Sequence, residues 1–177
     1  HDGFLASDVE VTMEQVNAAA EGAGVIEEGT SNGALSFLSQ EGGYDLTLYT
    51  SIGLGDGQQA NNPWLQELPD PITRASWDNY LTVSAADAEA LDLVNEHVSN
   101  GALNGSYVNI KLGNVVVENV PVIIQPGQAK GSVGLALGYG KKAAIQEEMQ
   151  TGVNAYPLYQ NFSNIQKVTI EKASGMH

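Results

Sequence analysis

The sequence predicts a mainly β protein, a barrel of short strands with a few short helices on its periphery. Many short runs of apolar, β-branched and aromatic residues are bounded by Gly, Asn or Pro, which is typical of strands joined by turns. Two of these runs are joined by the dipeptide Gly113-Asn114, a hairpin signal. The chain lacks the regular strand–helix alternation of a doubly wound sheet. With 177 residues, 42% of them hydrophobic, it is long enough for one domain with a buried core.

The first third of the chain contains one clear helix signal. Ser7 and Glu10 fit a capping box, in which the Ser side chain accepts a backbone hydrogen bond and the Glu side chain reaches back. Apolar residues then recur at helical spacing as far as Ala20, and glycines follow as a stop. Short strands are expected over residues 34–38 and 44–48.

The middle of the chain begins with an extended, proline-containing segment over residues 63–71. A strand is expected next, over residues 77–83. Ser84 and Asp87 then predict the capped start of a short helix that ends near Leu93.

Four further strands are expected in the second half, over residues 107–112, 115–125, 132–138 and 168–171. Pro121 lies within the second of them. Proline cannot donate a ladder hydrogen bond, so it predicts a sheet edge or a bulge at that point.

The composition excludes several classes of site and partner. The chain has no Cys, so disulfides, zinc ribbons and cysteine-ligated iron–sulfur clusters are excluded within it. Its formal charge of −14 disfavours both nucleic acid and anionic lipid surfaces as partners. No apolar run approaches the roughly 18 residues of a membrane span, and no signal peptide is recognised. Because the chain begins at His1 without a Met, we expect it to be a piece of a longer protein.

Two glycine-rich stretches resemble nucleotide-binding loops only superficially. The Gly-x-Gly-x-Gly stretch at 53–57 lacks the dinucleotide-binding spacing, and no helix is expected after it. The stretch 134–142 lacks the Walker spacing, and its alternation predicts a strand that ends in a tight turn. Lys130, Lys141 and Lys142 flank this stretch, which leaves open a phosphate site made of backbone N–H groups and ammonium charges.

The sequence carries no recognisable catalytic or metal-binding pattern. The three histidines, His1, His97 and His177, lack metal-ligand spacing. Neither a Gly-x-Ser-x-Gly elbow nor a Ser-x-x-Lys motif occurs. The acidic residues are expected on solvated faces rather than in a general acid/base pair. We therefore expect no catalytic residue and no metal site in this chain, and leave open whether the longer protein is an enzyme.

Residues 61–80 concentrate both tryptophans, three prolines and the only arginine of the chain. Two interpretations stay open. The stretch is either a rigid connection whose Trp64 and Trp77 fill the core, or a loop that shapes a ligand or partner surface.

Several stretches resemble the carboxy-terminal domain of molybdopterin oxidoreductases. They are Leu-Pro-Asp-Pro at 68–71, Tyr-Leu-Thr-Val-Ser-Ala-Ala-Asp-Ala-Glu-Ala-Leu at 80–91, Gly-Ser-Tyr-Val-Asn-Ile at 105–110, Val-Pro-Val-Ile-Ile-Gln-Pro-Gly at 120–127, Asn-Ala-Tyr-Pro-Leu at 154–158 and Lys-Val-Thr-Ile-Glu at 167–171. The longer stretches 61–73, 125–140 and 152–158 are similar to the molybdopterin-oxidoreductase-like iron–sulfur subunit of alternative complex III.

The resemblance implies a six-stranded double-psi β-barrel over residues 44–172, like the domain that binds the molybdopterin dinucleotide in that family. A helix-containing lead-in from a preceding domain (1–43) and a tail (173–177) flank it. The family implies a non-catalytic scaffold in a membrane quinol-oxidising electron-transfer complex of a respiratory chain. Its partners would be the rest of its own subunit and neighbouring subunits, at the periplasmic face of a bacterial inner membrane. Iron–sulfur clusters are expected elsewhere in the parent subunit.

Two sets of residues follow from this resemblance. Where cofactor-binding relatives carry Arg and His, residues 55–61 offer no cation for a pyrophosphate, so the favoured interpretation is a lost cofactor site. The candidate interface residues are then Trp64, Leu65, Leu68, Arg74 and Trp77. The alternative is a genuine molybdopterin dinucleotide-binding domain, with Asn61, Asn62, Gln128, Lys130 and Asn154 as its cofactor contacts. A free-standing ligand-binding barrel is a third possibility. Residues 94–104 and the helical-looking residues 141–150 depart from the family pattern.

Overall fold

The computed structural model describes residues 43–98, 103–143 and 145–177. Its elements, in chain order, are β1 (Tyr44–Thr50), α3 (Pro63–Glu67), β2 (Leu81–Val83), α4 (Ala85–Ala90), β3 (Asn95–His97), β4 (Leu103–Leu112), β5 (Val115–Ile124), β6 (Ser132–Leu137), the 3-10 turns η1 (Glu147–Met149) and η2 (Tyr156–Leu158), and β7 (Ile165–Met176). The predicted helix over residues 7–20 and the predicted strand over residues 34–38 lie outside the described residues.

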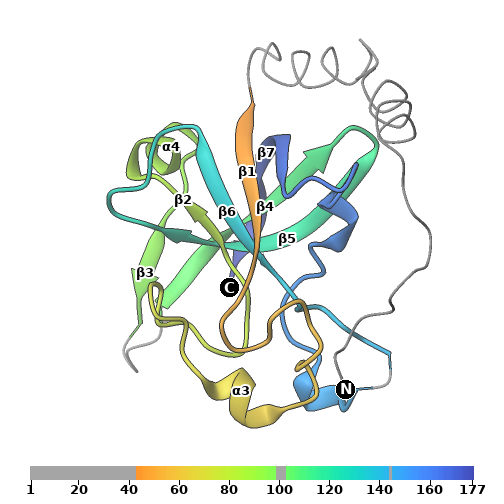
Figure 1. Ribbon diagram of the computed structural model, residues 1–177. Coiled ribbons are helices and arrows are strands. Elements are labelled where there is room, and N and C mark those ends of the chain that lie inside the picture. The colour runs from red at the N-terminus through yellow and green to blue at the C-terminus, as the bar shows by residue number, and fades with distance from the viewer. Residues whose placement is uncertain (1–42, 99–102, 144) are drawn as a thin grey trace, which may run out of the picture. The chain divides into compact units, whose positions relative to one another are not determined.

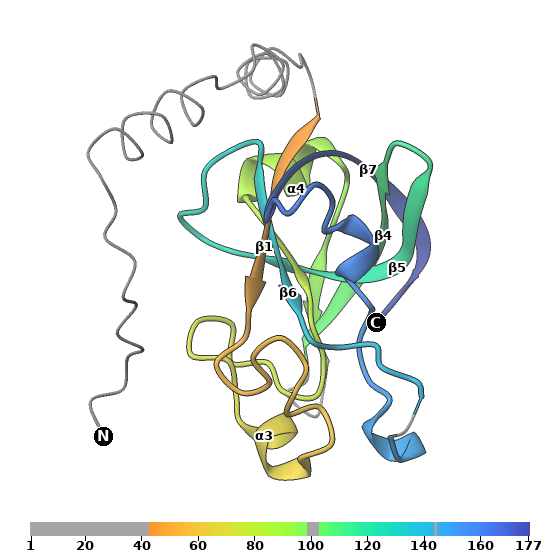
Figure 2. The same ribbon diagram turned by 45° about the vertical axis from the view of Figure 1, so that its right-hand side comes forward.

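Six of the described strands close into a barrel (Figure 1). Neighbouring strands follow the order β4, β5, β2, β6, β1 and β7, and β7 then pairs with β4 again. β3 lies outside this circuit and pairs with the first residues of β4. In the views of Figures 1 and 2, α4 lies near one end of the barrel and α3 near the other. The predicted mainly β barrel with short peripheral helices is confirmed.

The strand pairing repeats itself within the barrel. β1 pairs parallel with β6 and antiparallel with β7. β5 likewise pairs parallel with β2 and antiparallel with β4. The remaining pairs, β2 with β6 and β4 with β7, are antiparallel. Exchanging β1, β2 and β4 for β5, β6 and β7 therefore leaves the pairing pattern unchanged, so the two halves of the barrel are topologically equivalent.

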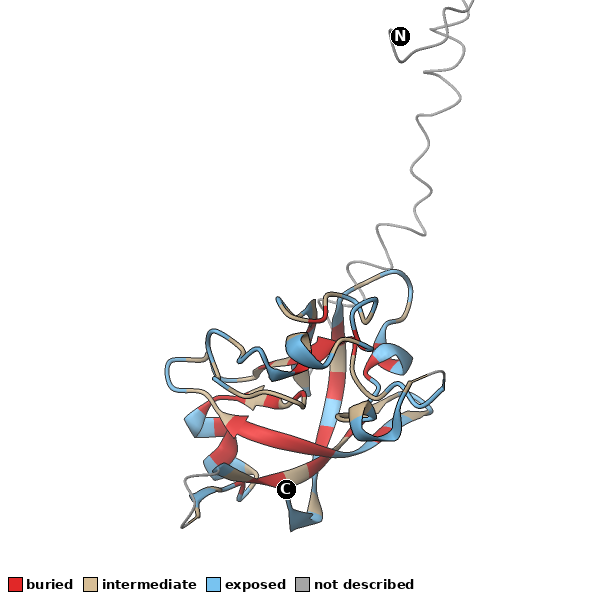
Figure 3. Ribbon diagram, turned by 90° about the horizontal axis from the view of Figure 1, so that it is seen from below, coloured by how far each residue is buried: buried red, intermediate tan, exposed pale blue. Residues whose placement is uncertain are grey.

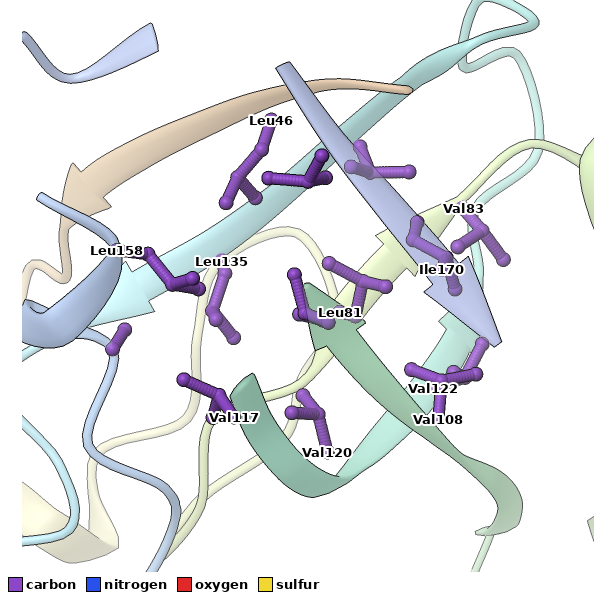
Figure 4. Packing of buried hydrophobic residues seen from close by; sticks show 14 of the residues in the cluster. Leu46, Leu81, Val83, Val108, Val117, Val120, Val122, Leu135, Leu158 and Ile170 are labelled. Atoms are coloured by element: carbon purple, nitrogen blue, oxygen red, sulfur yellow. The ribbon is translucent and has the colours of Figure 1, made fainter. Parts of the chain in front are cut away.

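Alternation along the strands fills the barrel with aliphatic side chains. Successive strand residues point to opposite faces, so Leu46 and Leu48 are buried in β1 while Thr47 between them is exposed. Figure 3 shows the buried residues along the strands, and Figure 4 shows side chains from several strands meeting in the interior. Each fully buried Leu, Val or Ile side chain contributes about 1.5–3 kcal/mol to folding. The interior is lined by Leu46, Leu48, Leu81, Val83, Val108, Ile110, Val120, Val122, Val133, Leu135, Leu158, Val168 and Ile170.

The bulge or edge predicted from Pro121 is confirmed as a bulge. The β4–β5 register shifts between Val108 and Ile110, and Asn119 on the opposite strand has a φ of 55°. β5 then leaves β4 and pairs with β2 from Val122 onward. Pro121, opposite Tyr107, is the last β5 residue paired with β4, so its missing N–H lies at the end of that ladder.

The predicted cap of the helix after β2 is confirmed. The Ser84 hydroxyl accepts from the Asp87 backbone N–H at 3.1 Å and donates to the Asp87 carboxylate at 2.6 Å. That carboxylate also accepts from the Gly131 N–H at 2.7 Å, which ties α4 to the β5–β6 connection. The helix ends at Ala90, before Leu93, because Asp92 adopts a left-handed conformation with a φ of 54°.

Two segments before β2 differ from their predicted structure. Residues 63–67 form the helix α3 rather than an extended segment, because Asn62 caps it and Pro63 fits the first helical turn. β2 begins at Leu81 rather than at residue 77. Trp77 has a φ of 64°, a conformation that no strand residue adopts, so the chain turns there.

Three further differences concern the second half of the chain. β3 was not predicted, because its sequence Asn-Glu-His is polar and has no strand pattern. β7 is much longer than residues 168–171 and continues through residues 173–176, so most of the predicted tail is strand. The described part of residues 141–150 contains only the 3-10 turn η1 instead of a longer helix.

Candidate interaction surface and ligand clefts

Exposed apolar side chains gather on the segments that connect β1 to β2. The side chains of Trp64 and Ile52 are 82% and 75% exposed, and those of Leu68 and Ile72 are also exposed. We call these four residues the α3 surface. Single exposed apolar residues are common on proteins, whereas several on one connection indicate a contact surface.

Backbone contacts hold the segments of the α3 surface together. Asn62 Oδ1 accepts from the Trp64 N–H at 3.1 Å and fixes the start of α3. Gly53 lies so close to α3 that a Cβ atom on it would be 2.9 Å from the Leu65 carbonyl oxygen. The buried Gln66 side chain donates to the Ala60 carbonyl at 3.2 Å. α3 is therefore anchored on its inner side while Trp64 faces outward.

The turn after α3 is built around Asp70. Its carboxylate accepts from the N–H groups of Ile72 at 2.9 Å and of Thr73 at 2.8 Å. Its backbone N–H donates to the Ala75 carbonyl at 2.8 Å, and the Arg74 N–H donates to the Asp70 carbonyl at 2.8 Å. This closed turn presents the apolar side chain of Ile72 on the surface.

The five predicted interface residues take different positions. Trp64, Leu68 and Arg74 are exposed, whereas Leu65 and Trp77 are half-buried. Trp64 therefore does not fill the core. For this residue, the interpretation of residues 61–80 as a loop that shapes a surface holds, and the core-filling interpretation does not. Ile52 and Ile72 were missed, because a single apolar residue in a loop carries no recognisable sequence signal.

A small cleft lies where the parallel strands β1 and β6 end. Its walls come from the loops after these strands and from the segment before η2, and its volume is about 260 Å³. The carboxyl ends of parallel strands are a common place for ligand sites. We call it the glycine cleft, and it is lined by Asp56, Gly57, Gly138, Tyr139, Lys141, Asn154 and Tyr156.

Two glycines let the cleft-forming loops cross in contact. Gly57 has a φ of 105° and Gly138 a φ of 97°, conformations that favour glycine. A Cβ atom on Gly138 would lie 2.8 Å from the Gly57 nitrogen. The Gly-x-Gly-x-Gly stretch and the glycine-rich end of β6 thus allow two backbones to cross. The strand predicted over residues 132–138 is confirmed as β6, whereas the tight turn predicted at its end is a bend at Gly138.

Polar groups on the walls of the glycine cleft bond mainly to one another. The Tyr156 hydroxyl donates to the Asp56 carbonyl at 2.5 Å. The Asn154 side-chain oxygen accepts from the Tyr156 N–H at 3.1 Å, and the Asp56 carboxylate accepts from the Gln58 N–H at 3.2 Å. Burial, and next the negative charge of Asp56, raise the pKa of Tyr156. The cleft is also lined by one carboxylate, that of Asp56, and one ammonium group, that of Lys141.

The residues predicted as cofactor contacts are not brought together. Only Asn154 lines the glycine cleft; Asn61 lines a separate hollow beside η1. The Asn62 side chain caps α3, and the Gln128 side chain donates to the carbonyls of Thr82 at 2.9 Å and Ser132 at 2.5 Å. Lys130 is exposed before β6.

The three lysines around β6 cannot hold one phosphate together. Lys130 precedes this strand, whereas Lys141 and Lys142 follow it. Six strand residues span about 20 Å, several times the reach of a phosphate contact. The glycine cleft also holds the carboxylate of Asp56, which repels an anion. The described residues thus do not fit the several phosphate charges of a pterin dinucleotide.

A second groove lies outside the barrel between the Asp70 turn and the β5–β6 connection. Its volume is about 370 Å³, and Gln128, Thr82 and Tyr49 contribute to its wall. Burial, and next the negative charge of Asp70, raise the pKa of Tyr49.

A carboxylate and two aromatic side chains surround His177. The Asp78 carboxylate lies 2.8 Å from His177 Nε2, and the rings of Tyr80 and Tyr107 meet the imidazole edge-on. Burial raises the pKa of Asp78, although His177 and the Asn79 N–H act in the opposite direction. Burial, and next the charge of Asp78, raise the pKa of Tyr80 to about 12.

The described residues contain no group of three or more His, Asp or Glu side chains that could hold a metal ion. Among the same residues, no helix has the length and apolar character needed to cross a membrane. No family model and no curated protein matches the chain.

Proposed function

We propose that this chain is a non-catalytic scaffold domain of a molybdopterin-oxidoreductase-like subunit in a membrane quinol-oxidising complex, alternative complex III. In this proposal the barrel has lost the cofactor site of its relatives and holds subunits together at the periplasmic face of the membrane. The iron–sulfur clusters of the parent subunit lie in another region of it.

The strand pairing supports the family assignment. A double-psi barrel consists of two interlocked halves of three strands each, and the exchange of β1, β2 and β4 for β5, β6 and β7 has this form. The connections from β1 to β2 and from β5 to β6 each pass over one strand of the other half. We therefore propose the double-psi type for this barrel.

The observation that carries the scaffold role is the α3 surface. An exposed indole and three exposed aliphatic side chains project from a connection that is held by its own hydrogen bonds. Apolar side chains on a connection held in this way lose little conformational entropy on binding. Trp64 is the natural anchor of the contact, because tryptophans in the centre of interfaces dominate their binding energy.

The glycine cleft supports loss of the cofactor. Asp56 places a negative charge there. The side chains of the predicted contacts Asn62 and Gln128 form hydrogen bonds within the fold instead. Its volume of about 260 Å³ also lies below the roughly 300–1,000 Å³ of pockets that bury drug-sized ligands.

The test uses the full-length subunit purified within its membrane complex. We expect no molybdenum by metal analysis and no fluorescent pterin after denaturation. Changing Trp64 and Leu68 together to Ser should release neighbouring subunits, whereas Phe162→Ser, which removes another exposed aromatic, should leave the complex intact. Stoichiometric molybdenum would refute the loss of the cofactor, and an unchanged complex with the double variant would refute the scaffold role of the α3 surface.

One observation favours the alternative, a genuine molybdopterin dinucleotide-binding domain. Lys141 and Asn154 line the same cleft near the ends of the parallel strands β1 and β6, where an ammonium group and an amide could bind a phosphate. Under this alternative, Lys141→Met lowers the pterin content of the purified subunit; under the scaffold proposal there is no pterin to lose.

A further inference from the structure

A further cavity adjoins the glycine cleft, shares two residues with it and differs from it in chemistry. It lies along the outer side of β1, beside the loop at Asp56 and the turn η2, and its volume is about 540 Å³. Asp56 and Tyr156 line both cavities, whereas Lys141 lines only the glycine cleft. We call it the tyrosine groove, after Tyr49, Tyr156 and Tyr159 in its wall.

The fold fixes where each of these tyrosines lies. Tyr49 follows the buried Leu48 in β1 and therefore points to the outside of the barrel. η2 is anchored by the fully buried Leu158, so that Tyr156 and Tyr159 on either side of it stay at the surface. The side chains of Tyr156 and Tyr159 are 42% and 39% exposed, which leaves ring surface open to a ligand.

The Tyr156 ring is held in place by its hydroxyl, which donates to the Asp56 carbonyl at 2.5 Å. This bond joins residues separated by 100 positions along the chain and holds Asp56 in the wall of the groove. The N–H of Tyr159 donates to the Tyr156 carbonyl at 2.9 Å, so the backbone holds the two tyrosines close together along the chain. Of the two rings, that of Tyr156 is fixed by its hydroxyl.

The charge of the wall has one sign. Asp56 is the only ionisable side chain other than tyrosine among the described residues that line the groove. The faces of aromatic rings carry negative potential and attract cations that come within about 6 Å of the ring centre. The net charge of −14 adds a long-range field of the same sign. Anions are thus repelled, and an apolar cation is favoured.

We propose that the tyrosine groove binds a small organic cation of the quaternary ammonium class. The methyl groups of such a cation pack on the rings of Tyr156 and Tyr159, while its charge lies near the Asp56 carboxylate. Because such a cation is weakly hydrated, its transfer from water into an aromatic groove costs less free energy than that of a primary ammonium ion. This binding goes beyond the scaffold role and does not depend on it, because the α3 surface and the groove share no residue.

The test is calorimetric titration of the 177-residue chain with choline. The comparison ligand is its neutral carbon isostere, in which a tert-butyl group replaces the trimethylammonium group. We expect saturable binding of choline and about tenfold weaker binding of the isostere, since two partly exposed cation–π contacts and one ion pair together account for that ratio.

Two pairs of variants separate the groove from general effects. Tyr159→Ala should weaken choline binding by about three- to tenfold, whereas Phe162→Ala, which removes a nearby exposed ring outside the groove, should not. Asp56→Asn should weaken it about as much, whereas Glu147→Gln removes the same charge elsewhere and should have little effect. Circular dichroism spectra should be the same for all four variants.

Three results would each overturn the proposal: no saturable binding of choline, equal binding of the neutral isostere, or equal losses in the groove variants and their controls. None of them bears on molybdenum content or subunit release, so failure here is distinguishable from failure of the scaffold role.

Discussion

Replacing Asn79 by Ala should lower the free energy of unfolding by about 3 kcal/mol. The Asn79 side chain is 2% exposed and joins β6 to the segment before η2. Its Nδ2 donates to the carbonyls of Ala136 at 2.8 Å and Val153 at 3.1 Å, and its Oδ1 accepts from the Val153 N–H at 2.8 Å. Each of the three bonds contributes about 0.5–1.5 kcal/mol net, and the Val153 N–H is left without this acceptor.

The assay is urea unfolding of the full chain, followed by tryptophan fluorescence and circular dichroism. The midpoint should fall with an unchanged slope, since the native surface changes little. A loss of about 3 kcal/mol corresponds to a melting temperature lower by about 6–12 °C for a chain of this size. Asn79→Asp should cost more, because a buried carboxylate would face two carbonyl oxygens.

The matched control is Asn109→Ala. Asn109 Oδ1 accepts a single bond near the surface, from the Asn119 N–H at 3.0 Å, so the variant should lose about 1 kcal/mol or less. Equal losses for the two alanine variants, or a loss below about 1 kcal/mol for Asn79→Ala, would refute the reasoning.

Three other predictions concern the cap, the surface and alkaline pH. Ser84→Ala should lower the free energy of unfolding by about 1–2 kcal/mol in the same urea assay, because the Asp87 N–H loses its cap; an unchanged midpoint would contradict this. Trp64→Ser should change stability by less than about 0.5 kcal/mol, since the indole is exposed; a larger loss would show that it supports the fold. The raised pKa of Tyr80, about 12 against 10.0 for the ordinary side chain, means that the unfolded chain loses this proton first. The free energy of unfolding that this proton contributes is therefore present below pH 10 and is lost between pH 10 and about 12. In Tyr80→Phe the free energy of unfolding should fall less over that range, by about 1 kcal/mol after allowance for solvent screening. Identical decline of the variant and the parent chain would exclude Tyr80 as a cause.

Local patterns were sufficient for several of the strands and for one helix cap, but not for β3, for the start of β2 or for the length of β7. The alternation of β1, the Gly113-Asn114 hairpin and the Ser84 cap depend on residues within a few positions of one another, and the structure has them where the sequence places them. α3 was missed although Asn62-Pro63 is a usable start signal, because prolines further along suggested an extended segment. The left-handed conformation of Trp77 is set by contacts around it and has no local signal.

The residues of the candidate sites could be predicted from the sequence much less well than the strands. Among the residues chosen for cofactor contacts, Asn62 and Gln128 bond within the fold. Asp56 and Tyr156 each lie in a stretch noted in the sequence, 53–57 and 154–158, but nothing local indicates that the two meet, and the structure joins them across the chain. For Trp64 the sequence left both a core position and a surface position open, because an indole between prolines fits either. The structure places it on the surface.

By itself, the sequence determined that this protein is mainly β, lacks cysteine chemistry and carries a strongly acidic charge, since these properties follow from composition and from side-chain alternation. Only the tertiary structure decided the closed strand order, the α3 surface and the meeting of Asp56 with Tyr156. The physical reason is that a strand with alternating apolar residues can pair with any similar strand. Which strands become neighbours depends on packing and loop closure over the whole chain, and the sites are formed by those neighbours.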